Sequence, residues 1–374
     1  MTRRVAFVYE DAVSQHLLRG DHPMQPIRLR HTYELLQAYG AFDGDTSLLL
    51  PPRAATEEEL GWLHSPEYIS AVRSFSQGQS GYEPGRFNFT AQGDNPIYPG
   101  IYDASALSTG ASLVAAEMVA SHRVDVAFNI SGGLHHAAQG HASGFCVFND
   151  PALAIKYFLD LGLRVAYVDI DAHHGDGVQD FFFDDDRVLT ISIHESGQFL
   201  FPGTGHVAEV GSGKGVGYSV NIPLYPYTDD DIYLEVFREV APPLLRAFAP
   251  DVLVTQLGID SYHSDPLTHL QITTRGFVEA VRELARLDVP WLALGGGGYD
   301  LGAVARAWSL AYGVMLDVEW PDRIPDSCVQ FVGTDQLRDT IRPEIPRDVQ
   351  AQARRFAEET VSAIKAQVFP VHNL

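Results

Sequence analysis

The feature that most constrains the fold of this chain is an apolar run that ends in a cluster of ionisable residues. Residues 165–180 read VAYVDIDAHHGDGVQD, and the ionisable side chains begin where the apolar segment stops: Asp169, Asp171, His173, His174 and Asp176. Buried carboxylates and imidazoles are costly unless they are paired or bind a metal. Because side chains alternate faces along an extended segment, Asp169, Asp171 and His173 share one side. This pattern favours a divalent metal site, and the alternative is a solvated helix N-terminus capped by Asp176.

Composition and charge limit the classes of protein to which the chain can belong. The sequence has 374 residues and a formal net charge of −22, which disfavours binding to nucleic acid or to anionic membranes. Cys146 and Cys328 are the only cysteines, so no disulfide framework is expected. The apolar run near the N-terminus is too short for a signal peptide, and no stretch has the roughly 18 apolar residues of a membrane span. We therefore expect a soluble cytoplasmic protein.

The rest of the chain alternates strand-like and helix-like segments. We expect strands at 4–9, 125–130, 165–168, 188–193, 218–222, 251–258 and 290–294. We expect helices at 26–39, 66–75, 103–121, 151–161, 228–248, 274–287, 301–316 and 347–368. This order predicts an α/β fold with one mostly parallel central sheet and helices on both faces.

Four of the expected strands end in polar or glycine-rich sequence. The strands that end near residues 130, 168, 257 and 294 lead into His135 and His136, the Asp169 cluster, Asp260, and the glycine run before Tyr299. Ligands of such sheets bind at the carboxyl ends of the strands. We therefore expect a metal held by Asp171, His173 and Asp260, with open positions as in catalytic sites. Zinc is the first choice, and Fe(II), Co(II) or Mn(II) can compete.

Hydrolysis at such a metal would need a base, an acid and a donor to the carbonyl oxygen. His135 and His136 are candidates for proton transfer, with Asp169 and Asp176 left over to orient them. Tyr299 follows four glycines that let the loop approach a ligand closely, so its phenol could polarise a carbonyl. The alternatives are a satisfied core histidine pair and a phosphate-binding glycine loop, although the lysine of a phosphate loop is missing.

Aromatic residues in the loops could line an apolar channel. Gly144 with Phe145, and Phe201 before Pro202, are placed for this role, and ordinary core packing is the alternative. Other histidines have no spacing that demands a role, and we expect them to be structural or surface residues: His194, His206, His263 and His269. For His174 we expect only local packing or hydrogen bonding.

Six motifs carry a resemblance to a known family. They are SGGLHHA at 131–137, SGFCVFND at 143–150, YVDIDAHHGDG at 167–177, FPGTG at 201–205, LGID at 257–260 and LGGGGY at 294–299. With them the chain resembles the histone deacetylase superfamily, and most of all the bacterial acetoin-utilisation branch close to class I. The resemblance spans about 26–316. It implies the three-layer arginase/deacetylase-like fold and a single deacetylase domain over 1–374, with a C-terminal helical extension at about 320–374.

The resemblance also implies a role for individual residues. His136 would be the general base and acid oriented by Asp176, and His135 its electrostatic partner paired with Asp169. Tyr299 would polarise the acetyl carbonyl. The zinc ligands would be Asp171, His173 and Asp260. Substrate would contact Asp94, Gly144, Phe145, Phe201, Leu267 and Gly297, and Arg28 would line an internal channel through which acetate leaves. A structural potassium ion would lie beside Asp169, Asp171, His173, Ser192 and Ile193.

The function implied is zinc-dependent hydrolysis of N6-acetyl-lysine to lysine and acetate, with a metal-bound water as nucleophile. Expected partners are acetylated proteins or peptides, for example acetyl-CoA synthetase.

Leu134 stands where many eukaryotic members carry Trp, so the wall of the inner cavity would differ. Leu267 stands where polyamine-preferring relatives can carry an acidic residue, which favours acetyl-lysine. The alternative within the fold is an acetylpolyamine amidohydrolase. A binuclear manganese ureohydrolase lacks its second aspartate cluster here, and a binding protein without activity is the remaining alternative.

Overall fold

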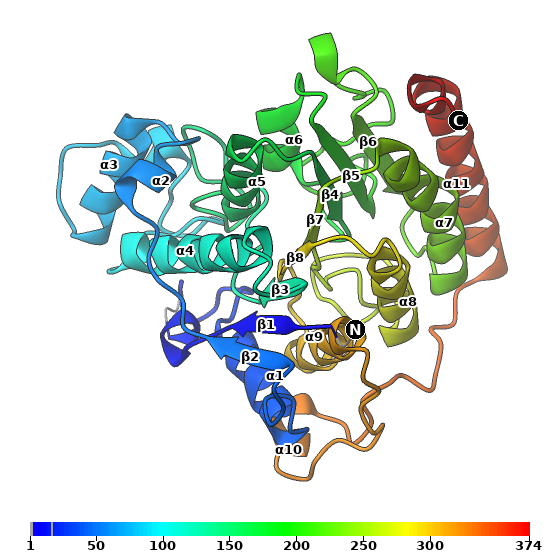
Figure 1. The fold of residues 1–374 in the computed structure, drawn as a ribbon, viewed down its shortest axis with the longest axis horizontal. Helices are drawn as coiled ribbons and strands as arrows, with labels where there is room; N and C mark the ends of the chain where they lie inside the picture. The colour runs from blue at the N-terminus through cyan, green and yellow to red at the C-terminus, as the bar shows by residue number, and fades with distance from the viewer. Residues whose placement is uncertain (1–2, 16–17) are drawn as a thin grey trace.

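The computed structural model describes residues 3–15 and 18–374, and its centre is one eight-stranded sheet (Figure 1). The strand order is β2-β1-β3-β8-β7-β4-β5-β6, and each pairing is parallel. The strands are β1 Val5–Val8, β2 Ser47–Leu50, β3 Val126–Asn129, β4 Val165–Asp169, β5 Val188–Glu195, β6 Ser219–Leu224, β7 Val252–Gln256 and β8 Trp291–Leu294.

Helices cover both faces of the sheet (Figure 1). The helices on one side are α4 Ile101–Ala120, α5 Asp150–Asp160 and α6 Asp176–Phe182, with α2 Glu57–Leu60 and α3 Pro66–Ser76 beyond α4. Those on the other are α1 Ile27–Ala38, α7 Asp230–Phe248, α8 Thr274–Ala285, α9 Leu301–Leu316 and α11 Arg347–Gln367, with α10 Val329–Val332 packed on α9. Short 3₁₀ helices lie at Asp11–Ser14, Pro84–Phe87, Gly213–Gly215 and Phe369–His372. The expected three-layer α/β architecture is therefore confirmed.

The strands are apolar on both sides because both faces of the sheet are buried. In β1, Val5 and Phe7 belong to the core under α1 and α9, whereas Ala6 and Val8 belong to the core under α4 and α5. Strands of this kind read as nearly continuous apolar runs, as parallel sheets covered by helices require. Successive side chains of β1 thus point alternately into the hydrophobic cores on the two faces of the sheet.

The sequence patterns missed one strand and one packing relation. Strand β2 is only four residues long and pairs with β1 at the edge of the sheet, where Leu49 is exposed. Helix α11 packs on α7 and β6, so the segment after α9 returns to the far edge of the sheet. Over the part of the chain that the structure describes, no helix is both long and apolar enough to cross a membrane.

Candidate active site

The site lies where the four central strands end. Strands β3, β8, β7 and β4 are consecutive in the sheet, so their carboxyl ends lie side by side. The segments that follow them carry the histidine pair, the glycine run, Asp260 and the Asp171–His173 segment. The topology therefore brings together the four polar segments that the sequence places after these strands.

Asp171, His173 and Asp260 form the candidate metal cluster. All three are buried, and one ligand atom from each lies within 4.8 Å of the others. The His173 Nδ1 atom lies 3.1 Å from Asp171 Oδ1 and 2.8 Å from Asp260 Oδ2. Two carboxylate oxygens and one imidazole nitrogen thus face a common point, as the predicted ligand set requires.

The second oxygen of each carboxylate is held by the protein. Asp171 Oδ2 accepts hydrogen bonds from Gln256 Nε2 at 2.7 Å and from the Gly297 N–H at 2.8 Å. Asp260 Oδ1 accepts one from the Ala172 N–H at 2.7 Å. A Cβ at Gly297 would collide with the Asp260 carboxylate, so only glycine fits there. Each carboxylate is oriented by these donors, and Asp171 Oδ1 also accepts the His173 N–H at 3.0 Å while it faces the common point, as in sites where outer residues orient the ligands.

The electrostatics of the cluster fit a bound cation. Burial opposes a charged imidazole, but Asp260 and Asp171 raise the pKa of His173 well above its ordinary value. Burial and repulsion by Asp171 raise the pKa of Asp260 to about 6. Both shifts show that two buried carboxylates at this distance attract positive charge, which a divalent metal would supply. The residues present therefore fit the expected metal.

The two histidines form matched hydrogen-bonded dyads. His135 Nδ1 lies 2.7 Å from Asp169 Oδ2, and His136 Nδ1 lies 2.7 Å from Asp176 Oδ1. The two Nε2 atoms lie 3.0 Å apart. When each Nδ1–H donates to its carboxylate, the two Nε2 atoms face each other and can share one proton. The predicted pairs are thus in contact, and Asp176 is also the first residue of α6.

The pKa values of the two histidines move in opposite directions. Burial would lower the pKa of His135, but attraction by Asp169 and Asp171 raises it to about 9. Burial and repulsion by His135 lower the pKa of His136 to about 4, although Asp176 opposes the change. At neutral pH this makes His135 the charged ring and His136 the neutral one, which is the form that accepts a proton.

Two residues hold the histidine loop from outside. Asn149 Nδ2 donates to the carbonyl oxygens of His135 at 3.0 Å and Ala137 at 2.9 Å. The buried Asp150 carboxylate accepts the N–H groups of Gly133 at 3.0 Å and Leu134 at 2.8 Å. The last two residues of the SGFCVFND motif therefore position the histidines of the SGGLHHA motif.

The expected wall residues surround the histidines. The Phe201 ring lies 5.1 Å from that of His136 and is 43% exposed, as a residue at an opening would be. The Phe145 ring meets the Tyr299 ring edge-on at 5.7 Å. Gly144 has a φ of 49°, and a Cβ there would collide with His136 and lie 2.9 Å from Phe201 Cε1. The glycine therefore allows this wall to approach the His136 ring closely.

Asp94 and Leu267 lie farther out. The Asp94 side chain is exposed, and His22 Nε2 lies 3.2 Å from its carbonyl oxygen while the His22 ring meets Phe145 at 4.5 Å. Leu267 is half-buried, and its N–H donates to Asp265 Oδ1 at 2.9 Å. His22 thus links the rim at Asp94 to Phe145, and Asp265 holds Leu267; the sequence singled out neither residue.

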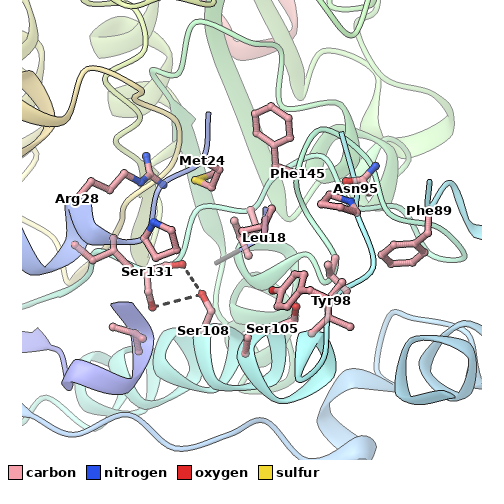
Figure 2. A pocket seen from close by; sticks show the side chains of 18 residues that line it. Leu18, Met24, Arg28, Phe89, Asn95, Tyr98, Ser105, Ser108, Ser131 and Phe145 are labelled. Atoms are coloured by element: carbon pink, nitrogen blue, oxygen red, sulfur yellow. Dashed lines mark hydrogen bonds between the residues drawn. The ribbon is translucent and has the colours of Figure 1, made fainter. Parts of the chain in front are cut away.

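A cavity of about 100 Å³ lies behind Phe145, above helix α4 (Figure 2). Figure 2 shows Arg28 at one end of it and Phe89 at the other, with Ser105 and Ser108 on the helix below. Leu134 is also part of its lining. Arg28 is buried, and its Nε has no hydrogen-bond partner among the described residues. Arg28, for which a channel role was expected, therefore lines a cavity that Phe145 also lines, and the channel itself stays a prediction.

The residues expected beside potassium lie at the β4–β5 pairing. Asp169 is directly opposite Ser192 in the register, and Ile193 is the next residue of β5. Their neighbour His194, expected to be structural or at the surface, is fully buried; its Nδ1 lies 2.8 Å from Ser192 Oγ and its Nε2 3.0 Å from the Gly205 carbonyl oxygen. His174 Nδ1 contacts Thr204 Oγ1 at 2.8 Å, in agreement with its expected hydrogen-bonding role.

Sequence reasoning missed several supporting residues of the site. Tyr167 donates its hydroxyl proton to Asp169 Oδ2 at 2.6 Å, and Gln256 orients Asp171. Tyr167 is two residues before Asp169 in β4, so the alternation of the strand could have identified it. Gln256 is the last residue of β7, where a buried amide is a signal for a site. Asp265 and Asn149 gave no such signal, because the site residues that they hold, Tyr299 and His135, lie 34 and 14 residues away.

Comparison with known proteins agrees with this geometry. Residues 22–315 match the histone deacetylase domain family. The chain is 42% identical over 331 residues to the acetoin utilization protein AcuC of Bacillus subtilis (strain 168), covering 86% of this chain and 85% of that protein. It is 38% identical over 335 residues to histone deacetylase 1 of Homo sapiens, covering 89% of this chain and 69% of that protein.

Solved structures give the same result. A crystal structure of a histone deacetylase homologue complexed with SAHA matches with a TM-score of 0.87 and 29% identity, over 96% of this chain and all of that one. A homologue from Aquifex aeolicus matches with a TM-score of 0.86, at the same identity and coverage. Fold and site together define a hydrolytic deacetylase, and the chain belongs to the histone deacetylase family. Within the family it is similar to the bacterial acetoin-utilisation branch.

Proposed function

We propose that this protein is a metal-dependent lysine deacetylase that hydrolyses the acetamide of N6-acetyl-lysine in proteins or peptides. The observation that carries the proposal is the set of two histidine–carboxylate dyads beside the buried cluster of Asp171, His173 and Asp260. Phe145, Phe201 and Gly144 line the approach, which suits a narrow, apolar acyl-lysine side chain.

In the proposed reaction the chain's own groups move the protons. His136 Nε2, neutral because its pKa is low, accepts a proton from the water that attacks the acetyl carbon. The Tyr299 hydroxyl donates to the carbonyl oxygen as negative charge develops there. Burial and the charge of Asp260 raise the pKa of Tyr299 well above its ordinary value, so the phenol keeps its proton. The histidine pair returns a proton to the departing lysine nitrogen, giving lysine and acetate.

Zinc is the metal we propose for Asp171, His173 and Asp260, with Fe²⁺, Co²⁺ or Mn²⁺ able to replace it. A metal bound there would polarise the carbonyl and acidify water. A structural potassium ion beside Asp169, Asp171, His173, Ser192 and Ile193 is part of the same proposal.

The proposed metal dependence is tested by measuring hydrolysis of an acetyl-lysine peptide after metal removal and after return of each metal. Activity that survives full metal removal, or that persists in Asp260→Asn, would contradict the proposal.

The second candidate is an acetylpolyamine amidohydrolase, favoured by the net charge of −22 and by the exposed Asp94. The half-buried, apolar Leu267 favours acetyl-lysine instead, because it offers no charge to a cationic substrate. Replacing it tests this reasoning. Leu267→Glu should raise kcat/KM for acetylputrescine and lower it for an acetyl-lysine peptide, with Leu267→Gln as the uncharged control. Equal effects of the two variants on acetylputrescine would rule out charge as the basis of selectivity.

We further propose that residues 1–374 act as one deacetylase domain with its core at about 26–316. The single sheet and the packing of α11 on α7 and β6 support this view. Acetylated proteins such as acetyl-CoA synthetase are the proposed partners, and the cytoplasm is the proposed location. The support for both is the similarity to the bacterial acetoin-utilisation branch.

A further inference from the structure

The peptide bond between Gly298 and Tyr299 is held at both ends by the side chains of two buried residues, Arg28 and Asp265. Arg28 Nη1 donates to the Gly298 carbonyl oxygen at 2.9 Å, and the Tyr299 N–H donates to Asp265 Oδ2 at 2.8 Å. These two groups belong to one rigid plane, because the peptide bond between them is planar. A guanidinium on one side and a carboxylate on the other therefore fix the orientation of the plane from which Tyr299 extends.

The second oxygen of Asp265 holds another part of the site. Oδ1 accepts the N–H of Leu267 at 2.9 Å, so one carboxylate joins the segment after β7 to the glycine run after β8. Asp265 is only 7% exposed, and both hydrogen-bond partners of its carboxylate are donors. Each oxygen of the carboxyl group accepts one backbone N–H, so the orientation of the group is fixed from both sides. The carboxylate thus couples the wall residue Leu267 to the residue proposed to polarise the carbonyl.

The position is costly for a carboxylate. Burial and repulsion by Asp260 raise the pKa of Asp265 to about 8, and the two backbone N–H groups only partly oppose this. On the carbonyl side of the same peptide bond, the Arg28 guanidinium (Figure 2) lies over the Trp308 ring at 5.2 Å.

We propose that Asp265 is a positioning residue, which aims the Tyr299 phenol and sets the Leu267 wall through their backbone N–H groups. The proposal rests on the proposed function, because it requires that Tyr299 act on the substrate carbonyl. Asp265 touches neither substrate nor metal in this role. Its removal should act mainly on kcat, since misplacement of a catalytic group by about 1 Å can cost about 10²-fold.

A double-mutant cycle tests the proposal. Tyr299→Phe should lower kcat on an acetyl-lysine peptide about 10²–10³-fold, and Asp265→Ala about 10²-fold. If Asp265 acts through the phenol, adding Asp265→Ala to Tyr299→Phe should lower kcat by less than about threefold, because coupled residues are not additive. Losses that multiply in the double variant would overturn the proposal. A Tyr299→Phe variant with near-normal kcat would instead overturn the proposed function.

Two further variants separate positioning from loss of fold. Asp265→Asn keeps the shape and one acceptor oxygen, so its kcat should fall between those of the wild type and Asp265→Ala; an unchanged kcat would contradict the proposal. Asp230→Ala is the matched control, because Asp230 is also a buried carboxylate that accepts a backbone N–H, that of Thr273 at 2.8 Å, at the start of α7. It should lower Tm and leave kcat unchanged; an equal loss of kcat would attribute the Asp265 effect to general destabilisation and overturn the proposal.

Discussion

The two histidines proposed to be catalytic, His135 and His136, have equivalent carboxylate partners and opposite pKa shifts. The difference comes from what surrounds each dyad, since His135 has both Asp169 and Asp171 nearby while His136 faces the charge of His135. Interacting groups of this kind titrate as a pair. The pair thus holds one proton, shared between the two Nε2 atoms, that it can give to a leaving group.

The pH dependence of the reaction should report this arrangement. His135 stays protonated below its pKa of about 9, so kcat/KM should fall as the pH rises through that value. Asp169→Asn removes the charge that contributes most to raising the pKa of His135, so the alkaline limb should move to lower pH. A pH profile of kcat/KM on an acetyl-lysine peptide measures the shift. An alkaline limb that stays in place would mean that His135 does not produce it; Asp125→Asn serves as the distant control.

Removal of the proposed base should be more damaging than removal of any histidine outside the site. His136→Ala is expected to lower kcat by about 10²–10⁴, the range for general acid–base catalysis. KM should change little, because the neutral ring contributes mainly to proton transfer. Steady-state kinetics beside His206→Ala, which alters an exposed histidine, provide the measurement. Comparable kcat values for the two variants would remove His136 from the mechanism.

At the scale of elements, the loops that carry Gly144, His136 and Phe201 are in close contact. Gly144 has no room for a Cβ beside His136, and its φ of 49° is unfavourable for other residues. Gly140, in the same loop, has only the Ser65 Oγ at 4.0 Å from the position of a Cβ.

Gly144→Ala should therefore displace His136 or Phe201 and lower kcat/KM about 10²-fold, whereas Gly140→Ala should leave kcat/KM within about twofold of the wild type. Peptide kinetics and Tm for the two variants check this directly. A Gly144→Ala enzyme as active as Gly140→Ala would show that this wall does not constrain the catalytic ring.

Most helices and strands and the expected residues of the site could be predicted from the sequence. The contacts by which residues distant in sequence, such as Asp265, hold the site could not. The strands at 125–130 and 290–294 and their polar ends follow from apolar runs and glycines, which are local signals. Strand β2 is as short as β3 and β8, but Pro51 and Pro52 follow it directly and it lies at the edge of the sheet beside β1. Asp265 lies 34 residues from Tyr299, and the pairing of β7 with β8 places the segments that carry the two residues side by side.

At the scale of the whole molecule, the metal and the fold should be linked. Asp171 and Asp260 are buried close to each other, so a cation that binds the folded state alone stabilises it by mass action. At a metal concentration of about 100 times Kd the stabilisation is about 2.7 kcal/mol. Tm should therefore rise with added zinc in the metal-free protein. The rise should be much smaller in Asp260→Asn; an equal rise in both proteins would mean that the metal binds elsewhere.

The most direct measurement is a competition assay with the zinc-loaded wild-type protein. An acetyl-lysine peptide and acetylputrescine are mixed at equal concentration, and both products and acetate are quantified over time, so the product ratio gives the ratio of kcat/KM values. We predict that deacetylated peptide predominates and that acetate equals the sum of the two products. Predominant formation of putrescine, or no acetate from the peptide, would contradict lysine deacetylation as the function of this protein.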